Sequence, residues 1–461
     1  MSLKINGPSQ AALSATFARH PAKVSNLPSP LVIAHRGAAN LFPENTMPAF
    51  RGAAALGFPV EPDLSLLADG SVGVMHDATV DRTTWGTGNT VDQNAMSWGK
   101  LRADSDSYLN GGWGNVEVPL FPQVLGELGG KVVLFPEAKN GTGATARIIA
   151  QIVTAGLQDS VVLQVPDLVE AARARDAGIV AMLTTVTGVE YGNAAAYAAA
   201  GVVYAGVLPA SVTDATIAAF HAQGVKVIGY TLDRQVDVAA WLARGGDGYF
   251  SDDPLYASGA QNGYAYRLST LPQLGTWAHG MLNNASYRGK WSTSPWGFGW
   301  DDTTSAGTRS TLLGPICPIK GDPATATYTL EFDWTWQTSF DTGRWLGAFV
   351  ACPNDGQMDG SGTSRTGVNG YRLLRAKSGL LQINKVTNNV VGASLASTGF
   401  AVPADGSAFT MRVTVSPTSI EWRNVTTNEA VSTTDTSYRG GYVSLAASGV
   451  TAWCTRAAVT A

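Results

Sequence analysis

The sequence predicts an α/β protein in which a (β/α)8 TIM barrel is followed by an all-β antiparallel sandwich of jelly-roll type. Three observations support this prediction. The chain has 461 residues, which is longer than a domain with a single hydrophobic core usually is. From residue 31 to about 260, short β-rich apolar runs alternate with Ala-rich stretches of helical character. Beyond about residue 265 the helical pattern disappears, and Thr, Trp, Gly and Ser dominate.

The first part of the chain contains eight strand candidates separated by helical stretches. Several of these stretches, such as ATARIIAQIVTAG and DATIAAFHAQG, end in Gly, which is typical of a helix C-cap. Eight βα units in about 220 residues fit a TIM barrel, whose typical length is about 250 residues. A doubly wound parallel sheet remains the alternative. The strand candidates are 31–35, 59–67, 131–138, 161–165, 181–186, 202–207, 225–230 and 248–251.

The same patterns predict the domain boundaries. Residues 1–30 lack clear periodicity and are interpreted as an arm or linker, residues 31–260 as the barrel, and residues 265–461 as the sandwich. Within the barrel, residues 68–130 form a long insertion between the second and third strands, and we expect it to carry a hairpin. In the sandwich, segments such as TYTLEFDWTWQ and FTMRVTVS alternate in hydrophobicity as half-buried strands do.

Composition excludes some classes of function. The formal net charge of −4 argues against a nucleic-acid partner, which needs a basic face. No apolar run is long enough for a transmembrane segment, and residues 1–30 contain no signal-peptide core. The low charged content, 14%, favours action outside a cell or at a cell surface, with a cytoplasmic location as the alternative. The predicted sandwich and the absent signal-peptide core together suggest a virion tail as one such setting. The three cysteines, Cys317, Cys352 and Cys454, predict buried thiols, with one disulfide bridge as the alternative.

Polar residues gather at the predicted carboxyl ends of the first three barrel strands. Clustered carboxylates repel one another, and a hard divalent cation, Ca²⁺ or Mg²⁺, would neutralise them. Two histidines can exchange protons near neutral pH, while Arg and Lys can hold an anion. These residues are His35, Arg36, Glu44, Glu61, Asp63, His76, Arg82, Glu137 and Lys139.

At these residues the chain resembles the glycerophosphodiester phosphodiesterase family. The resemblance runs, in the order of the family's motifs, through IAHRGAANLFPENTMPAF, VEPDLSLLADGSVGVMHDATVDRTTWGTG, LFPEAKN, GYTLD and DGYFSDDP. It covers residues 31 to about 256. Several multi-residue motifs in the family's order make it far more specific than HRG alone.

The resemblance implies a TIM barrel that splits glycerophosphodiesters into glycerol 3-phosphate and an alcohol. It implies the general acid/base pair His35 and His76. It further implies the metal ligands Glu61, Asp63 and Glu137, and the phosphate- or substrate-binding residues Arg36, Lys139 and Glu44. Pro62 and Pro136 depart from the family's pattern, and we expect a bulge at the strand ends to accommodate them.

Three alternatives concern partners and activity. The substrate is either a small glycerophosphodiester or a polymer such as teichoic acid. The barrel is either active or an inactive scaffold in a glycan-binding or adhesion protein, and a sphingomyelinase D-like phospholipase is a weaker rival. The sandwich is a candidate carbohydrate-binding module because it is rich in tryptophan, although packing in the sandwich core is the favoured explanation for most of these residues. They are Trp277, Trp291, Trp296, Trp300, Trp334, Trp336, Trp345, Trp422 and Trp453.

Overall fold

The computed structural model divides the chain into two compact units, one ending at Ser258 and one beginning mainly at Gly259. Each unit is described by itself. Within the described residues, no helix has the length and apolar character needed to cross a membrane. The structure describes residues 22–39, 42–104, 115–141, 143–184, 193–259, 291–294, 297–301, 308–315, 322–339, 342–356, 367–402, 404–448 and 450–460.

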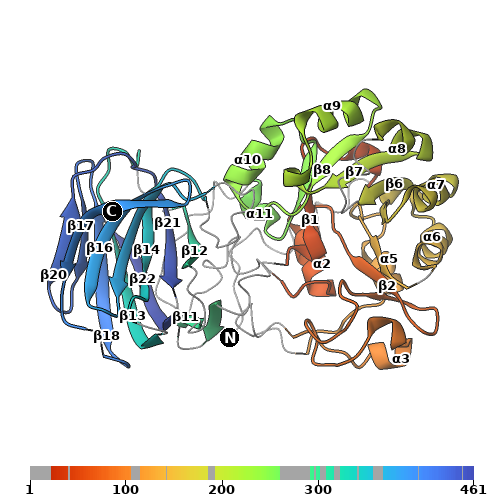
Figure 1. Ribbon diagram of the computed structural model, residues 1–461. Helices are drawn as coiled ribbons and strands as arrows, with labels where there is room; N and C mark the ends of the chain where they lie inside the picture. Colours follow the sequence, from red (N-terminus) through yellow and green to blue (C-terminus); the bar gives the residue numbers. More distant parts are fainter. Residues whose placement is uncertain are drawn as a thin grey trace. The chain divides into compact units, whose positions relative to one another are not determined.

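The first unit is a closed barrel of parallel strands, which confirms the predicted fold class (Figure 1). Neighbouring strands follow the order β1-β9-β8-β7-β6-β5-β4-β2, and a parallel bridge between Ala34 and Val60 closes the circle. This closure excludes the doubly wound alternative, because an open sheet has two edges. The strands are β1 (Leu31–Ala34), β2 (Asp63–Leu66), β4 (Glu137–Asn140), β5 (Val162–Val165), β6 (Val180–Thr184), β7 (Val202–Val207), β8 (Lys226–Gly229) and β9 (Gly248–Ser251).

Helices surround the strands in Figure 1, and their apolar faces form the larger core of the unit. Polar side chains begin several helices, as at α7, where Asp167 accepts a hydrogen bond from the amide of Glu170. Glycine ends α8 at Gly201, with a φ of 83°. The helices are α2 (Met47–Ala55), α5 (Phe121–Leu128), α6 (Ala144–Thr154), α7 (Leu168–Asp176), α8 (Ala194–Ala200), α9 (Asp214–Ala222), α10 (Gln235–Ala243) and α11 (Pro254–Ala257).

A second apolar cluster fills the barrel interior and includes Ile33, Phe135 and Phe250. Residues 22–27, from the predicted arm, pack against this cluster and pair with loops that precede strands. The amide of Ala22 donates to the carbonyl of Gly130, and its carbonyl accepts from the Ser160 hydroxyl. This segment therefore covers the amino-terminal end of the barrel, opposite the end where TIM barrels carry chemistry.

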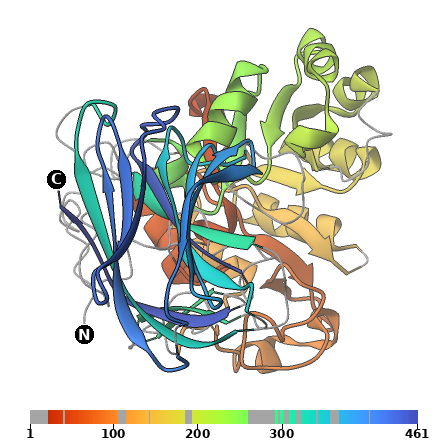
Figure 2. The ribbon, with the colours of Figure 1, turned by 60° about the vertical axis from the view of Figure 1, so that its left-hand side comes forward.

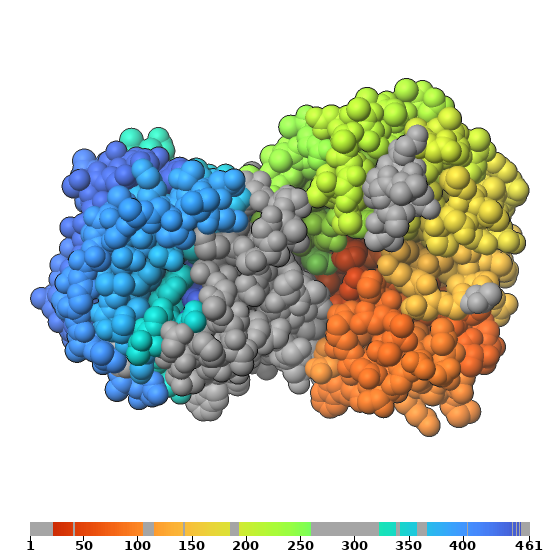
Figure 3. All heavy atoms as spheres, viewed as in Figure 1, coloured from red at the N-terminus to blue at the C-terminus, as the bar shows by residue number. Residues whose placement is uncertain are grey.

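The insertion between β2 and β4 forms a small packed body at the rim of the unit, coloured orange in Figure 3. It begins with β3 (Val72–Val74), which pairs antiparallel with β2, and includes α3 (Ala95–Trp98). Trp98 is fully buried in the insertion's own core, and its Nε1 donates to the carbonyl of Pro119 at 3.0 Å. Trp85 is 68% exposed. Trp98 is therefore a core residue of the insertion, whereas Trp85 lies at its surface.

The second unit contains two antiparallel sheets that share one core, as the sandwich prediction requires (Figure 2). One sheet follows the order β10-β11-β22-β13-β18-β19-β20 and the other β12-β21-β14-β15-β16-β17. The strands of the first are β10 (Trp291–Ser294), β11 (Gly297–Asp301), β22 (Val450–Thr460), β13 (Tyr328–Ser339), β18 (Ala408–Val415), β19 (Ile420–Asn424) and β20 (Glu429–Thr433). Those of the second are β12 (Thr308–Pro315), β21 (Tyr442–Ser448), β14 (Trp345–Cys352), β15 (Gly370–Ala376), β16 (Leu380–Thr387) and β17 (Val390–Gly399).

The tryptophans of this unit whose side chains are described are all buried. They are Trp334, Trp336, Trp345 and Trp422. Cys352 is a buried free thiol, and burial raises its pKa to about 12. The side chains of Cys317 and Cys454, and of the remaining tryptophans named for this domain, lie outside the described residues. For the described residues, the packing interpretation of both residue types is the better one.

Candidate active site at the carboxyl end of the barrel

A tight turn directly after β1 carries the first two candidate residues, His35 and Arg36. Arg36, Gly37 and Ala38 follow one another with φ values of 53°, 81° and 67°, all in the left-handed region. The backbone amide of Arg36 donates to Oε2 of Glu61 at 2.7 Å. The turn thus bends the chain sharply and ties it to the second strand.

Gly37→Ala is expected to lower the free energy of unfolding by about 2–5 kcal/mol. A left-handed φ costs an L-residue about 1–2 kcal/mol, and overpacking adds about 1–3 kcal/mol. A Cβ at Gly37 would lie 2.7 Å from the Cβ of Ala49 and 2.8 Å from Phe50. Chemical denaturation measures the loss. Gly57→Ala is the control, because Gly57 has a φ of 87° but open space around it. Equal losses in the two variants would contradict the steric part of the argument.

The segment Pro43–Thr46 forms the entry to α2. The Thr46 hydroxyl donates to the carbonyl of Pro43 at 2.7 Å and accepts from the amide of Ala49, so it caps the helix. Between these anchors, Glu44 and Asn45 are both buried, and Asn45 has a φ of 57°. The cap therefore fixes two polar side chains beside the turn after β1.

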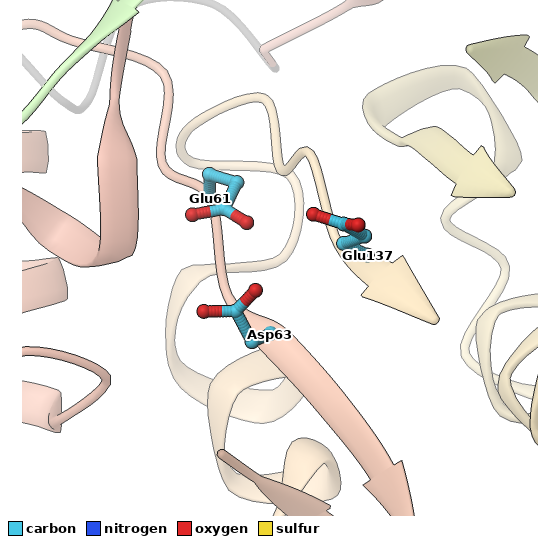
Figure 4. A group of neighbouring side chains, drawn as sticks. All are labelled: Glu61, Asp63 and Glu137. Atoms are coloured by element: carbon cyan, nitrogen blue, oxygen red, sulfur yellow. The ribbon is translucent and has the colours of Figure 1, made fainter. Parts of the chain in front are cut away.

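Three carboxylates meet on two neighbouring strands. Figure 4 shows Glu61 and Asp63 on one chain segment and Glu137 on the next, with their carboxylates turned toward one another. One ligand oxygen from each lies within 4.8 Å of the others. Asp63 and Glu137 are register partners at the start of β2 and β4, and Glu61 is two residues earlier on the same side. Among the described residues, this is the group of acids with metal-binding geometry.

Pro62 and Pro136 lie immediately before Asp63 and Glu137, where β2 and β4 begin. Proline has no N–H to donate, but each carbonyl still accepts a hydrogen bond from the adjacent strand. The amide of Glu137 donates to Pro62 at 2.9 Å, and the amide of Gln164 donates to Pro136 at 2.8 Å. The prolines thus mark irregular points just upstream of the acids, and the ladder slips by one residue soon after Asp63.

Glu61 and Asp63 are deeply buried and Glu137 is partly buried, so holding their charges in place costs free energy. Burial raises the pKa of Glu61 well above its usual value, and Asp63 and Glu137 raise it further. Burial would raise the pKa of Asp63 too, but Arg36 and Lys139 outweigh it and hold that pKa below its ordinary value. The Nζ of Lys139 lies 2.8 Å from Oε1 of Glu137 and 3.6 Å from Oδ1 of Asp63.

The donor set fits a hard divalent cation. All three groups are carboxylates, which Mg²⁺ and Ca²⁺ prefer. Asn45 holds Asp63 with two hydrogen bonds: Nδ2 donates to Oδ2 at 2.7 Å, and Oδ1 accepts from the Asp63 amide at 3.0 Å. The other oxygen of Asp63, Oδ1, is buried and accepts no hydrogen bond. Asn45 therefore leaves this oxygen as a ligand for a cation.

Each candidate histidine has its Nδ1 beside a carboxylate. Nδ1 of His35 lies 2.7 Å from Oδ1 of Asp252, and Nδ1 of His76 lies 2.7 Å from Oδ1 of Asp77. Both imidazoles are close enough to Asp63 to lower its pKa, so both lie near the acid cluster. The turn after β1 and the start of the insertion thus bring two imidazoles to one end of the barrel.

Glu44 lies between two arginines rather than among the three acids. Its Oε1 accepts from Arg36 at 2.9 Å and from Arg82 at 2.8 Å. Arg82 also pairs with Asp77 through two nitrogens. Because a carboxylate repels phosphate, Glu44 can serve an anion only by holding these arginines in place. Burial alone would lower the pKa of both guanidiniums. Glu44 and Asp63 outweigh burial at Arg36, and Asp77 and Glu44 outweigh it at Arg82, so the pKa of each arginine lies above its usual value.

The structure thus brings together every candidate named from the sequence and adds partners that the sequence did not reveal. Asn45 lies within the motif IAHRGAANLFPENTMPAF, but nothing in the sequence indicated that its side chain would hold Asp63. Asp252 and Asp253, which lie side by side in the DGYFSDDP motif, have different roles in the structure. Asp252 contacts His35, and Asp253 caps α11 by accepting from the amide of Tyr256 at 3.0 Å.

The fold and the site together define a TIM-barrel protein with an acid cluster suited to a divalent cation at its carboxyl-terminal end. Residues 35–256 match the model of the glycerophosphoryl diester phosphodiesterase family, and this part of the chain belongs to that family.

Proteins similar to this chain include two named as glycerophosphodiester phosphodiesterases and one named as a phosphodiesterase. The bovine glycerophosphodiester phosphodiesterase 1 is 42% identical over 96 residues, which are 21% of this chain and 29% of that protein. The glycerophosphodiester phosphodiesterase of Caldanaerobacter subterraneus subsp. tengcongensis is 29% identical over 236 residues, 49% of this chain and 94% of that protein. A solved structure of an Oleispira antarctica phosphodiesterase in complex with the product sn-glycerol-3-phosphate is 22% identical, with a TM-score of 0.45, covering 51% of this chain and 97% of that one.

Proposed function

We propose that the barrel hydrolyses glycerophosphodiesters to glycerol 3-phosphate and an alcohol, using a divalent cation and two histidines. The observation that carries this proposal is the meeting of Glu61, Asp63 and Glu137, whose ligand oxygens lie within 4.8 Å of one another. Family membership of residues 35–256 supports the substrate class. The ion, Ca²⁺ or Mg²⁺, would be held by these three residues and would polarise a phosphoryl oxygen.

The remaining chemistry belongs to side chains of this chain. Arg36 and Lys139 lie beside the acids and would hold the phosphate oxygens; Arg36 offers a planar fork and Lys139 a point charge. One of the two histidines, His35 or His76, would take the proton from the nucleophile, which is either the substrate's own glycerol hydroxyl or a water molecule. The other would protonate the leaving alcohol as its bond to phosphorus breaks. Attack by the glycerol hydroxyl would give a cyclic phosphate that water then opens.

An inactive barrel is the competing proposal. A barrel that serves only as a scaffold has no need to keep a buried, mutually repelling acid cluster beside paired imidazoles. The eight residues to which the family resemblance assigns a role all take part in the contacts described above. The match to the glycerophosphoryl diester family favours that chemistry over a sphingomyelinase D-like activity.

A polymeric substrate and a glycan-binding sandwich are finer parts of the proposal. A teichoic-acid-like polymer is itself a chain of glycerol phosphodiesters, which a cell-surface or virion-tail enzyme would encounter. The described tryptophans of the sandwich are buried, so none of these offers a free ring to a sugar. Glycan binding would therefore need other side chains of that unit.

The full chain is expected to release glycerol 3-phosphate from sn-glycero-3-phosphocholine, and chelation should stop the release until Mg²⁺ or Ca²⁺ is added back. An enzyme-coupled assay for glycerol 3-phosphate measures both steps. A glycerol-phosphate polymer, tested in parallel, decides the substrate size. Cleavage of the small diester with the polymer untouched would rule out the polymer, and no release from either substrate would rule out the activity.

A further inference from the structure

Asp252 faces His35 because of the register between β1 and β9. These strands are parallel, and Ala34 is the register partner of Ser251. The next residue on each strand is therefore His35 on one side and Asp252 on the other. Their side chains meet with Nδ1 of His35 at 2.7 Å from Oδ1 of Asp252. The contact thus follows from the barrel itself and not from a surface loop.

Asp233, which follows β8, accepts hydrogen bonds from Asp252 and its neighbour Ser251. Oδ1 of Asp233 accepts hydrogen bonds from the amide of Asp252 at 2.7 Å and from the hydroxyl of Ser251 at 3.0 Å. The side chain of Asp252 is only 12% exposed, and that of His35 is 19% exposed. Two part-buried hydrogen bonds, one from the backbone of Asp252 and one from the neighbouring Ser251 side chain, therefore hold the segment that carries the carboxylate.

An ionised carboxylate only accepts hydrogen bonds, so Nδ1 of His35 must be the donor in this contact. A neutral imidazole with its proton on Nδ1 has a lone pair on Nε2, on the opposite side of the ring. The ring then presents Nε2 as the proton acceptor, with no rotation needed before reaction. Without the Asp252 carboxylate as acceptor, neither the orientation of the His35 ring nor its tautomer would be fixed.

We propose that Asp252, fixed by Asp233, is a positioning residue that holds His35 in the Nδ1–H tautomer with Nε2 directed to the substrate. This inference rests on the proposed function, in which His35 exchanges a proton with the substrate. No hydrogen bond or ion pair described above joins Asp252 to the acid cluster or to the phosphate-binding side chains, although its charge acts on Arg36 and helps to raise the pKa of that guanidinium. Its effect should therefore appear mainly in the rate of proton transfer, with only a small change in cation or substrate binding.

The test compares two neighbouring isosteric substitutions, Asp252→Asn and Asp253→Asn, in the full chain. Each removes one carboxylate charge, but Asp253 caps α11, and Asn is also a good N-cap. Asp252→Asn is expected to lower kcat by about 10²–10⁴-fold, with little change in KM. Asp253→Asn should leave kcat close to that of the unaltered chain. Equal kcat values for the two variants would overturn the proposal.

Nitrogen-15 NMR of the imidazoles gives a second readout that needs no turnover. The chain has five histidines, so His35 is assigned by its disappearance in His35→Ala. The unaltered chain should show the neutral His35 ring as the Nδ1–H tautomer, and Asp252→Asn should shift it toward Nε2–H. An Nε2–H ring in the unaltered chain would overturn the inference, even if Asp252→Asn fails to fold. If the unaltered chain shows no turnover, the proposed function fails while the tautomer measurement still decides the positioning.

Discussion

Glu61→Gln is expected to weaken divalent-cation binding by at least about 100-fold. Glu61 is 1% exposed and contributes one of three carboxylates to the cluster. Loss of a partner that merely orients a ligand already costs metal sites about 10–100-fold, and loss of a ligand should cost more. Isothermal titration calorimetry with Ca²⁺ and with Mg²⁺ measures the change directly. Glu117→Gln is the control, because the Glu117 side chain is 69% exposed and pairs only with Arg102 among the described ion pairs.

The same substitution separates binding from stability. A cation at 100 times its Kd should stabilise the unaltered chain by about 2.7 kcal/mol, whereas Glu61→Gln should show little of this gain. In cation-free buffer the variant should be at least as stable as the unaltered chain. The reason is that the substitution removes one of three mutually repelling carboxylates. A variant that binds cations normally, or that is strongly destabilised without them, would contradict the role given to Glu61.

His35→Ala and His76→Ala are each expected to lower kcat by about 10²–10⁴-fold, the usual contribution of one acid/base group. Cation affinity and the unfolding midpoint should change little, because neither side chain belongs to the acid cluster. Steady-state hydrolysis of sn-glycero-3-phosphocholine provides the measurement.

His221→Ala is the matched control for both histidines. His221 is also paired with a carboxylate, with Nε2 at 2.8 Å from Oδ2 of Asp247. Asp247 directly precedes β9, so this pair lies at the amino-terminal end of the barrel, away from the site. A loss of activity in His221→Ala as large as in the other two would show that the effect comes from damage to the fold.

Much of the barrel could be predicted because its signals are local. Alternating β and helical segments predicted all eight parallel strands, although β4 (Glu137–Asn140) overlaps only the end of the segment predicted at 131–138. The spacing of Glu61 and Asp63 predicted that both lie on one side of a strand. The position of Glu137 next to them depends on two strands being neighbours, which βα units make usual. Local periodicity was therefore sufficient to predict the barrel strands and the acid cluster at their carboxyl ends.

The partners of the site residues were harder to predict because they depend on register and side-chain direction. In the Asp252-Asp253 pair, only the register of β1 against β9 decides which carboxylate reaches His35. Asn45 reaches Asp63 through a left-handed φ that the sequence does not specify. Likewise, the sheet order of the sandwich, in which β13 pairs with β22, joins segments far apart in the chain.

The central claim is that acids from two neighbouring barrel strands gather one divalent cation beside a pair of imidazoles. Diffraction from crystals soaked in Mn²⁺, analysed for anomalous scattering, would test it most directly. We expect one strong peak bounded by carboxylate oxygens of Glu61, Asp63 and Glu137, at roughly 2.0–2.6 Å, the range of hard-cation distances. An active protein with no peak between these three side chains, or with its only peak elsewhere, would contradict the account.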